Sequence, residues 1–203
     1  MNRKDAIRDL ARLSQEMGVY DEFIETEEAP HPNRARFGGV LTLIDVPSDT
    51  APSGSCGHRV ILTKSVAQAA LPSLIGMGVN FSPDARGMHN TTTKHGVIMQ
   101  AAIYGQQLLV WGHLYGWDFP EIIQEIQQMP SGSFGMSYEL AKVNVVDMRQ
   151  KIWSFLRVVF TGAAILRREK AAYKQTEFRL LDSAESAQVA MAASEEQPKG
   201  ESE

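Results

Sequence analysis

The second half of the chain is dominated by long runs of β-forming residues with only short connections between them. Val97–Tyr104 and Gln107–Tyr115 are separated by the dipeptide Gly105-Gln106, which is a tight-hairpin signal. Met136–Val146 and Lys151–Leu166 form a second adjacent pair. Strands that follow each other directly do not fit a regular alternation of strands and helices. They predict an α+β fold built on an antiparallel sheet or barrel.

Shorter elements are expected elsewhere. The apolar spacing predicts an amphipathic helix over residues 3–17, strands over Val40–Val46 and Arg59–Thr63, a helix over Lys64–Ile75, and a short helical piece over Glu169–Tyr173. Residues 76–93 are rich in Gly, Asn, Ser and Thr, so we expect them to be largely irregular. Asp118 and Glu121 have the spacing of a capping box, and they predict a helix whose buried stripe is Ile122, Ile123, Ile126 and Met129.

Composition narrows the class of protein. The 203 residues fit one domain with short extensions, and a net charge of −4 with a pI near 5.8 argues against nucleic acid as the main partner. No apolar run reaches the roughly 20 residues of a membrane span, and the start lacks a secretory signal. Cys56 is the only cysteine, so an internal disulfide and a Cys-rich zinc site are excluded. These features predict a cytosolic protein.

The negative charge is concentrated at the C-terminal end. Residues 182–203 hold six acids and one base, a net −5, while the rest of the chain carries +1. This segment has no aromatic residue and only two large apolar ones, so we expect a disordered acidic tail. The tail is either a solvated terminus or a partner-binding or cleavable extension. The predicted organisation is an N-terminal helix and loop (1–36), a main domain (37–181) and the tail (182–203).

The sequence offers little conventional catalytic chemistry. None of the five histidines has a metal-ligand spacing, and the P-loop, GxGxxG and GxSxG motifs are absent, so no metal or cofactor is predicted. Ser137 follows Gly135-Met136 at the start of a strand, where a hydroxyl can face solvent beside backbone amides that would hold an oxyanion. His89, in an irregular stretch before a strand, best suits a general base. The simpler interpretation of Ser137 is a serine with a structural role, and that of His89 is a loop histidine hydrogen-bonded to the backbone.

The order of these features resembles the tailed-phage prohead maturation proteases, which are relatives of the herpesvirus assemblin proteases. His89 matches the family histidine, His95-Gly96 matches its Ile-Gly pair with His in place of Ile, and Ser137 matches the nucleophile in its Gly-x-Ser context. The resemblance spans roughly residues 70–176. It implies a herpes-protease-like antiparallel β-barrel flanked by helices. It also implies a serine endopeptidase in which Ser137 attacks the peptide carbonyl and His89 transfers the proton.

One position departs from the family pattern. Phage members of the family often carry a glutamate on the later strand, and Gly162 in Phe160–Leu166 stands where that acid is expected. Another residue could orient the base (His95, His113 and Asp147 are candidates), the enzyme could work as a dyad, or the chain could be inactive. In the herpesvirus relatives, arginines after this strand assist the oxyanion. Arg167 and Arg168 follow a comparable strand here, with solvated arginines as the alternative.

The resemblance implies a role in capsid maturation. The substrates would be capsid scaffold protein, major capsid protein and the chain's own tail near Ala193, with action in the host cytoplasm inside the procapsid and a homodimer as one arrangement. Neither nucleic acid nor a membrane is expected as a partner. The alternative is a non-catalytic scaffolding or assembly protein that keeps the protease fold and uses its terminal segments to bind partners. A third reading is an unrelated small-molecule hydrolase with a closed apolar pocket.

Overall fold

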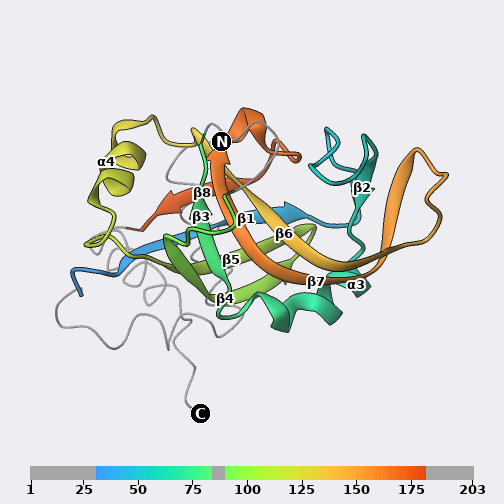
Figure 1. Ribbon diagram of the computed structural model, residues 1–203, viewed down its shortest axis with the longest axis horizontal. Coiled ribbons are helices and arrows are strands. Elements are labelled where there is room, and N and C mark those ends of the chain that lie inside the picture. Colours follow the sequence, from blue (N-terminus) through green and yellow to red (C-terminus); the bar gives the residue numbers. More distant parts are fainter. Residues whose placement is uncertain (1–30, 84–89, 182–203) are drawn as a thin grey trace, which may run out of the picture. The chain divides into compact units, whose positions relative to one another are not determined.

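The computed structural model describes residues 31–83 and 90–181. Residues 32–180 form one compact unit built on a single eight-stranded sheet (Figure 1). The strands are β1 (Ala35–Leu43), β2 (Arg59–Ile61), β3 (Gly78–Phe81), β4 (Gly96–Tyr104), β5 (Gln107–Leu114), β6 (Phe134–Val145), β7 (Ile152–Arg167) and β8 (Glu177–Leu180). The helices are α3 (Lys64–Ala70) and α4 (Pro120–Gln128), and 3-10 turns cover Leu71–Leu74 and Arg168–Lys170.

The sheet is mixed, which corrects the expectation of an antiparallel one. The strand order is β2-β7-β3-β4-β5-β1-β8, with β6 paired along the other edge of β7. Both β2 and β3 run parallel to β7, and the remaining pairs are antiparallel. β7 is long enough to receive β2 at its start and β3 near its end, and the connections from both strands cross over, so both pairs are parallel. An antiparallel expectation drawn from adjacent runs cannot foresee such crossovers.

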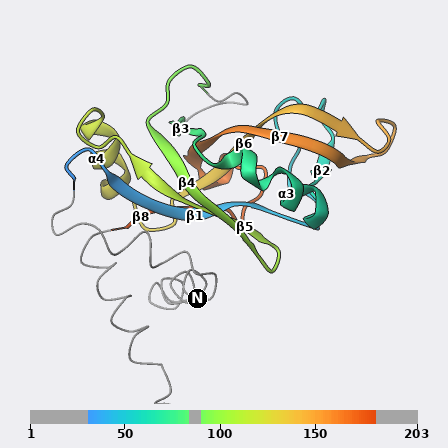
Figure 2. The same ribbon diagram turned by 90° about the horizontal axis from the view of Figure 1, so that it is seen from below.

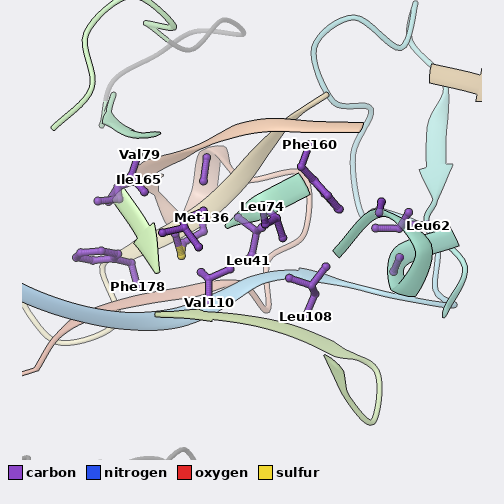
Figure 3. Packing of buried hydrophobic residues seen from close by; sticks show 14 of the residues in the cluster. Leu41, Leu62, Leu74, Val79, Leu108, Val110, Met136, Phe160, Ile165 and Phe178 are labelled. Atoms are coloured by element: carbon purple, nitrogen blue, oxygen red, sulfur yellow. The ribbon is translucent and has the colours of Figure 1, made fainter. Parts of the chain in front are cut away.

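The sheet curls into a half-barrel. Its two ends approach each other where the Met136 amide of β6 donates to Thr176 Oγ1, just before β8, at 3.3 Å. Side chains of the concave face form the main core, which Figure 3 shows with Leu41 and Val110 from one part of the sheet facing Val79 and Ile165 from the other. The concave face therefore forms the main core, while consecutive residues of β1 and β5 are buried, so that these two strands are covered on both faces.

Most of the predicted elements are present. The β4–β5 hairpin turns at Gly105-Gln106 as expected, with Tyr104 opposite Gln107. The predicted Lys64–Ile75 helix is α3 followed by a 3-10 turn, because Pro72 cannot continue the α-helical hydrogen-bond pattern. Ser73 ties this turn to β7, since its hydroxyl accepts the Phe160 amide at 2.9 Å.

Three local features differ from what the sequence led us to expect. The described part of residues 76–93 is irregular as expected except for β3, a central strand, although Gly78 and Asn80 are poor strand formers; pairing with β4 and β7 outweighs their propensity. The cap of α4 is Phe119, while the Asp118 carboxylate accepts the Asn33 side-chain amide instead. Strand β8 was not expected at all. The predicted stripe of α4 does face inward: Ile122 is buried, and Ile123, Ile126 and Met129 pack against the core.

The two helices lie toward opposite ends of the sheet. Figures 1 and 2 place α4 at one end of the unit and the turn between β6 and β7 at the other, with α3 nearer that turn. No helix among the described residues is long and apolar enough to cross a membrane. The predicted helix over 3–17 and the acidic tail over 182–203 lie outside the described residues.

Candidate functional site

Ser137 lies on the face of β6 that points away from the core. Along this strand Phe134, Met136 and Tyr138 contribute to the core, so the alternating residues Ser137 and Glu139 share the opposite face. Ser137 is half-buried and pairs with Ala164 of β7. The strand therefore presents a hydroxyl and, two residues on, a carboxylate on one side of the sheet.

The Glu139 carboxylate is held by two donors from other strands and loops. Lys94 Nζ lies 3.0 Å from its Oε2, and the side-chain amide of Asn80 donates to its Oε1 at 2.5 Å. The Glu139 side chain is only 10% exposed, compared with 30% for that of Lys94. A carboxylate so enclosed needs these donors, because burying it without partners would be costly.

Asn80 connects this carboxylate to the edge of the sheet beyond β3. Its side-chain amide also donates to the Ala163 carbonyl at 3.0 Å, and its Oδ1 accepts the Ser82 hydroxyl at 2.9 Å. Asn80 is fully buried, and it pairs with Ala164 from the side of β7 opposite Ser137. Ser137 and Asn80 therefore stand in one row, two strand spacings or roughly 10 Å apart at the backbone.

His89, the expected general base, lies outside the described residues. The next residue, Asn90, is described, and its amide donates to Ser82 Oγ at 3.2 Å. The Asn90 side chain in turn accepts the Thr92 and Thr93 amides. The chain that follows His89 is thus anchored to the same polar cluster that contains Asn80.

His95 does not have the contacts of an orienting residue. Its Nδ1 accepts the Phe81 amide at 2.9 Å, and its ring packs edge-on against Phe119. Burial lowers the pKa of His95, as does the charge of Lys94, while Glu121 acts in the other direction. These contacts hold a neutral imidazole that secures β3 and α4.

His113 and Asp147 are not on strands that neighbour Ser137 along the sheet. His113 is on β5, which follows β6 in the order β6-β7-β3-β4-β5, so three strands separate the two residues along that path. Asp147 lies ten residues beyond Ser137, past the end of β6, or roughly 30 Å along an extended strand. Its carboxylate is bound by the Arg149 side chain, and this hydrogen bond lowers the pKa of Asp147.

Gly162 pairs with Glu139 across β6 and β7. A Cβ built at Gly162 would lie 2.6 Å from Glu139 Oε2 and 3.1 Å from Lys94 Nζ. The space that a side chain at position 162 would enter is therefore already filled by the Glu139 carboxylate and its ion-pair partner.

Both arginines considered for the oxyanion have other contacts. Arg167 lies 3.5 Å from the Glu125 carboxylate and stacks over the Phe134 ring, and Arg168 lies 3.5 Å from the Glu177 carboxylate. With side chains 25% and 37% exposed, they are partly enclosed and not freely solvated. Their guanidinium groups link β7 and the following turn to α4 and β8.

The described residues contain no group of three or more His, Cys, Asp or Glu side chains that could hold a metal ion. Glu139, Lys94 and Asn80 are not among the site residues predicted from the sequence. Glu139 could have been found from the sequence. Side chains two residues apart on a strand share a face, and Ser137 was already predicted to lie on a strand. Lys94 and Asn80 gave no such signal, since their proximity depends on how β3 pairs with β7.

No protein-family model matches the chain, and no curated protein sequence matches it. Among solved structures, one that is similar is the Kaposi's sarcoma herpesvirus protease in complex with an allosteric inhibitor. The two share 12% sequence identity with a TM-score of 0.40, over 82% of this chain and 93% of that one. A likeness at this level assigns neither a family nor an activity to the chain.

Proposed function

We propose that the protein is a serine endopeptidase in which Ser137 is the nucleophile and His89 the general base. The observation that carries the proposal is the placement of a half-buried serine hydroxyl on the sheet face that also bears an enclosed carboxylate, Glu139. The anchoring of Asn90 at Ser82 supports the role of His89, because it ties the adjacent backbone to this face. His89 would accept the Ser137 proton and return it to the leaving amine.

The expected substrates are segments of capsid scaffold protein and major capsid protein, cut inside the procapsid in the host cytoplasm. This part of the proposal rests on the order of residues in the sequence, from His89 to the Gly-Met-Ser strand start. The same hypothesis includes a homodimer and cleavage of the chain's own tail near Ala193, which lies outside the described residues.

A fluorophosphonate probe tests the nucleophile directly, because it labels only an activated serine. Wild-type protein should be labelled, and Ser137→Ala protein should not. Ser154→Ala is the matched control, since Ser154 lies on β7 beside β2, near the other end of that strand, and its loss should leave labelling unchanged. Equal labelling of wild-type and Ser137→Ala protein would refute the assignment.

Intact-mass measurement tests the substrate. Incubated wild-type protein should lose a short C-terminal fragment near Ala193, and Ser137→Ala protein should keep its full mass. A full-length mass for the wild-type protein after prolonged incubation would argue against self-cleavage at this segment, whatever the labelling result.

A second candidate is a non-catalytic assembly protein with the same fold. The observation in its favour is that two histidines described near the sheet have structural contacts. His95 Nδ1 accepts the Phe81 amide, and His58 Nδ1 donates to the Gln150 carbonyl while its ring stacks on Trp153. An assembly protein would not react with the probe, and it would still bind scaffold protein when Ser137 is replaced.

A further inference from the structure

The distal part of the β6–β7 hairpin, which lies at one end of the unit in Figures 1 and 2, exposes a cluster of apolar side chains. Four of the eight large apolar residues that are exposed in the described part of the chain lie there, and they are 42% to 66% exposed. They are Val143, Val146, Met148 and Leu156. Exposed apolar residues that are scattered singly are normal, but a cluster of them indicates a surface on which another molecule packs.

Two β-bulges turn part of this surface outward. The register of β6 against β7 shifts between Ala141 and Asn144 and again between Asn144 and Val145. Val143 lies in the first bulge, and Leu156, on β7, is the extra residue of the second. A bulge takes a residue out of the strand alternation and re-aims its side chain. The two aliphatic side chains are therefore exposed because of the irregular register of this hairpin.

The same hairpin has a local positive charge. Residues 140–157 contain four bases and one acid, a net +3 in a chain of net charge −4. The acid, Asp147, is bound to Arg149. The other three bases are exposed and form no ion pair or side-chain hydrogen bond within the described part of the chain: Lys142, Lys151 and Arg157. Unpaired cations beside apolar side chains are complementary to a ligand that combines carboxylates with apolar groups.

The turn of the hairpin is held in one conformation by its own contacts. Asp147 Oδ1 accepts the Arg149 amide at 2.9 Å, and the Met148 carbonyl accepts the Trp153 indole N–H at 3.1 Å. His58, from the loop before β2, stacks on the Trp153 ring with the ring centroids 4.5 Å apart. A surface that is already ordered loses little conformational entropy when a partner binds to it.

The arrangement of charges favours an extended peptide over a membrane as the partner. Residues 146–151 connect the two strands, and four of these six are charged or polar: Asp147, Arg149, Gln150 and Lys151. Insertion of this tip into a bilayer would bury its charges first, which is costly. Among the described strands β6 pairs only with β7, so its other edge can accept the backbone of an added strand.

We propose that the distal β6–β7 hairpin is a docking surface for an extended acidic segment of a partner protein that carries aliphatic residues among its carboxylates. The carboxylates of the segment pair with Lys142, Lys151 and Arg157, and its aliphatic side chains pack against the exposed apolar residues of the hairpin. Val143 lies six residues beyond Ser137, or roughly 20 Å along β6, so this surface is separate from the Ser137 site. The inference goes beyond the proposed function and does not depend on it.

Fluorescence anisotropy with labelled synthetic peptides tests the proposal on the full chain. The probe is a pool of 12-residue peptides, as long as β6, made of Glu and Val in equal number and random order. One control pool has Lys in place of Glu, and a second has Ser in place of Val. The Glu/Val pool should bind, and more weakly at high salt because exposed charges are screened. The Glu/Ser pool should bind several-fold more weakly, and the Lys/Val pool should not bind.

Variants of the hairpin locate the binding. Lys151→Glu/Arg157→Glu should weaken binding of the Glu/Val pool by at least about tenfold, because it replaces two attractive charges by repulsive ones. Leu156→Ser should weaken it by about three- to tenfold through the loss of apolar contact. The matched controls are Lys170→Glu, an exposed base in the turn after β7, and Met99→Ser, an exposed apolar residue of β4. Both should bind the pool as the wild type does.

Thermal unfolding shows that each variant is folded, which we expect because all the substituted residues are exposed. The proposal would be overturned by a Glu/Val pool that does not bind, by equal binding of the Lys/Val pool, or by unchanged binding to the folded Lys151→Glu/Arg157→Glu variant. Vesicles of phosphatidylcholine and phosphatidylserine, and duplex DNA, are tested in parallel. If either binds to this surface and the peptides do not, the hairpin recognises a membrane or a nucleic acid and the proposal is wrong.

Discussion

Glu139 and Gly162 face each other across β6 and β7, and the carboxylate of the first occupies the space that a side chain on the second would need. A side chain at position 162 and the Glu139 carboxylate would thus compete for the same space. Cross-strand neighbours have Cβ atoms about 5 Å apart, close enough for one to take over the space of the other. This relationship makes both positions sensitive to substitution.

Gly162→Ala should destabilise the fold by about 1–3 kcal/mol, because the added methyl would meet the Glu139 carboxylate and the Gly78 carbonyl. In a Glu139→Ala background the same change should cost less, since one of the two obstacles is gone. Urea unfolding of the four proteins measures the coupling. Thr161→Ala is the control, because Thr161 is exposed and its loss should change stability by no more than about 0.5 kcal/mol. Strictly additive effects would contradict the crowding argument.

Lys94→Met should lower the free energy of unfolding by about 1–3 kcal/mol, because it leaves one oxygen of the enclosed Glu139 carboxylate without its donor. The double variant Lys94→Met/Glu139→Gln should lose less than the two single variants together. Arg149→Met removes an exposed ion pair with Asp147 and should leave stability essentially unchanged. Chemical denaturation measures the free energy of unfolding of each variant. If Lys94→Met lowered it no more than Arg149→Met does, the Lys94–Glu139 ion pair would not stabilise the fold as expected.

His95 should make the fold less stable in mild acid. Because burial lowers the pKa of His95 below its ordinary value of 6.5, the unfolded chain binds more protons than the folded one between the two pKa values. The stabilisation is therefore complete above pH 6.5 and declines as the pH falls toward the folded pKa. His95→Gln protein should show a shallower loss of stability between pH 7 and pH 5 in urea titrations. The same slope in both proteins would rule out this contribution.

The β4–β5 turn should require Gly105 because of its backbone conformation and not because a side chain there would meet a neighbour. Its φ of 54° lies in the left-handed region, and nothing lies within 4 Å of a Cβ built there. Gly105→Ala should cost about 1–2 kcal/mol and Gly105→Asn less, because Asn tolerates this region better. Gln106→Ala is the control at the exposed neighbouring turn position. Thermal unfolding that ranks Ala above Asn at position 105 would contradict the expectation.

Local sequence patterns were sufficient to predict the elements that depend on interactions between residues close together in the sequence. The Gly105-Gln106 hairpin, the stripe of α4 and the two long runs that became β6 and β7 were all predicted from alternation, spacing and turn residues. The Gly135-Met136-Ser137 context predicted a strand residue that can face solvent, and Ser137 lies half-buried on the face of β6 opposite the core. The helix over 3–17, His89 and the tail with Ala193 stay predictions, because they lie outside the described residues.

The sequence by itself determined that adjacent strands build the domain and that a serine lies near the start of one of them, because both depend on neighbours along the chain. Only the tertiary structure decided what surrounds that serine. Strand β3 has weak propensity and exists through its pairing with β4 and β7, and that pairing brings Asn80 and Lys94 to Glu139 from 59 and 45 residues away. Contacts between distant segments depend on strand order and register, which a local pattern does not encode.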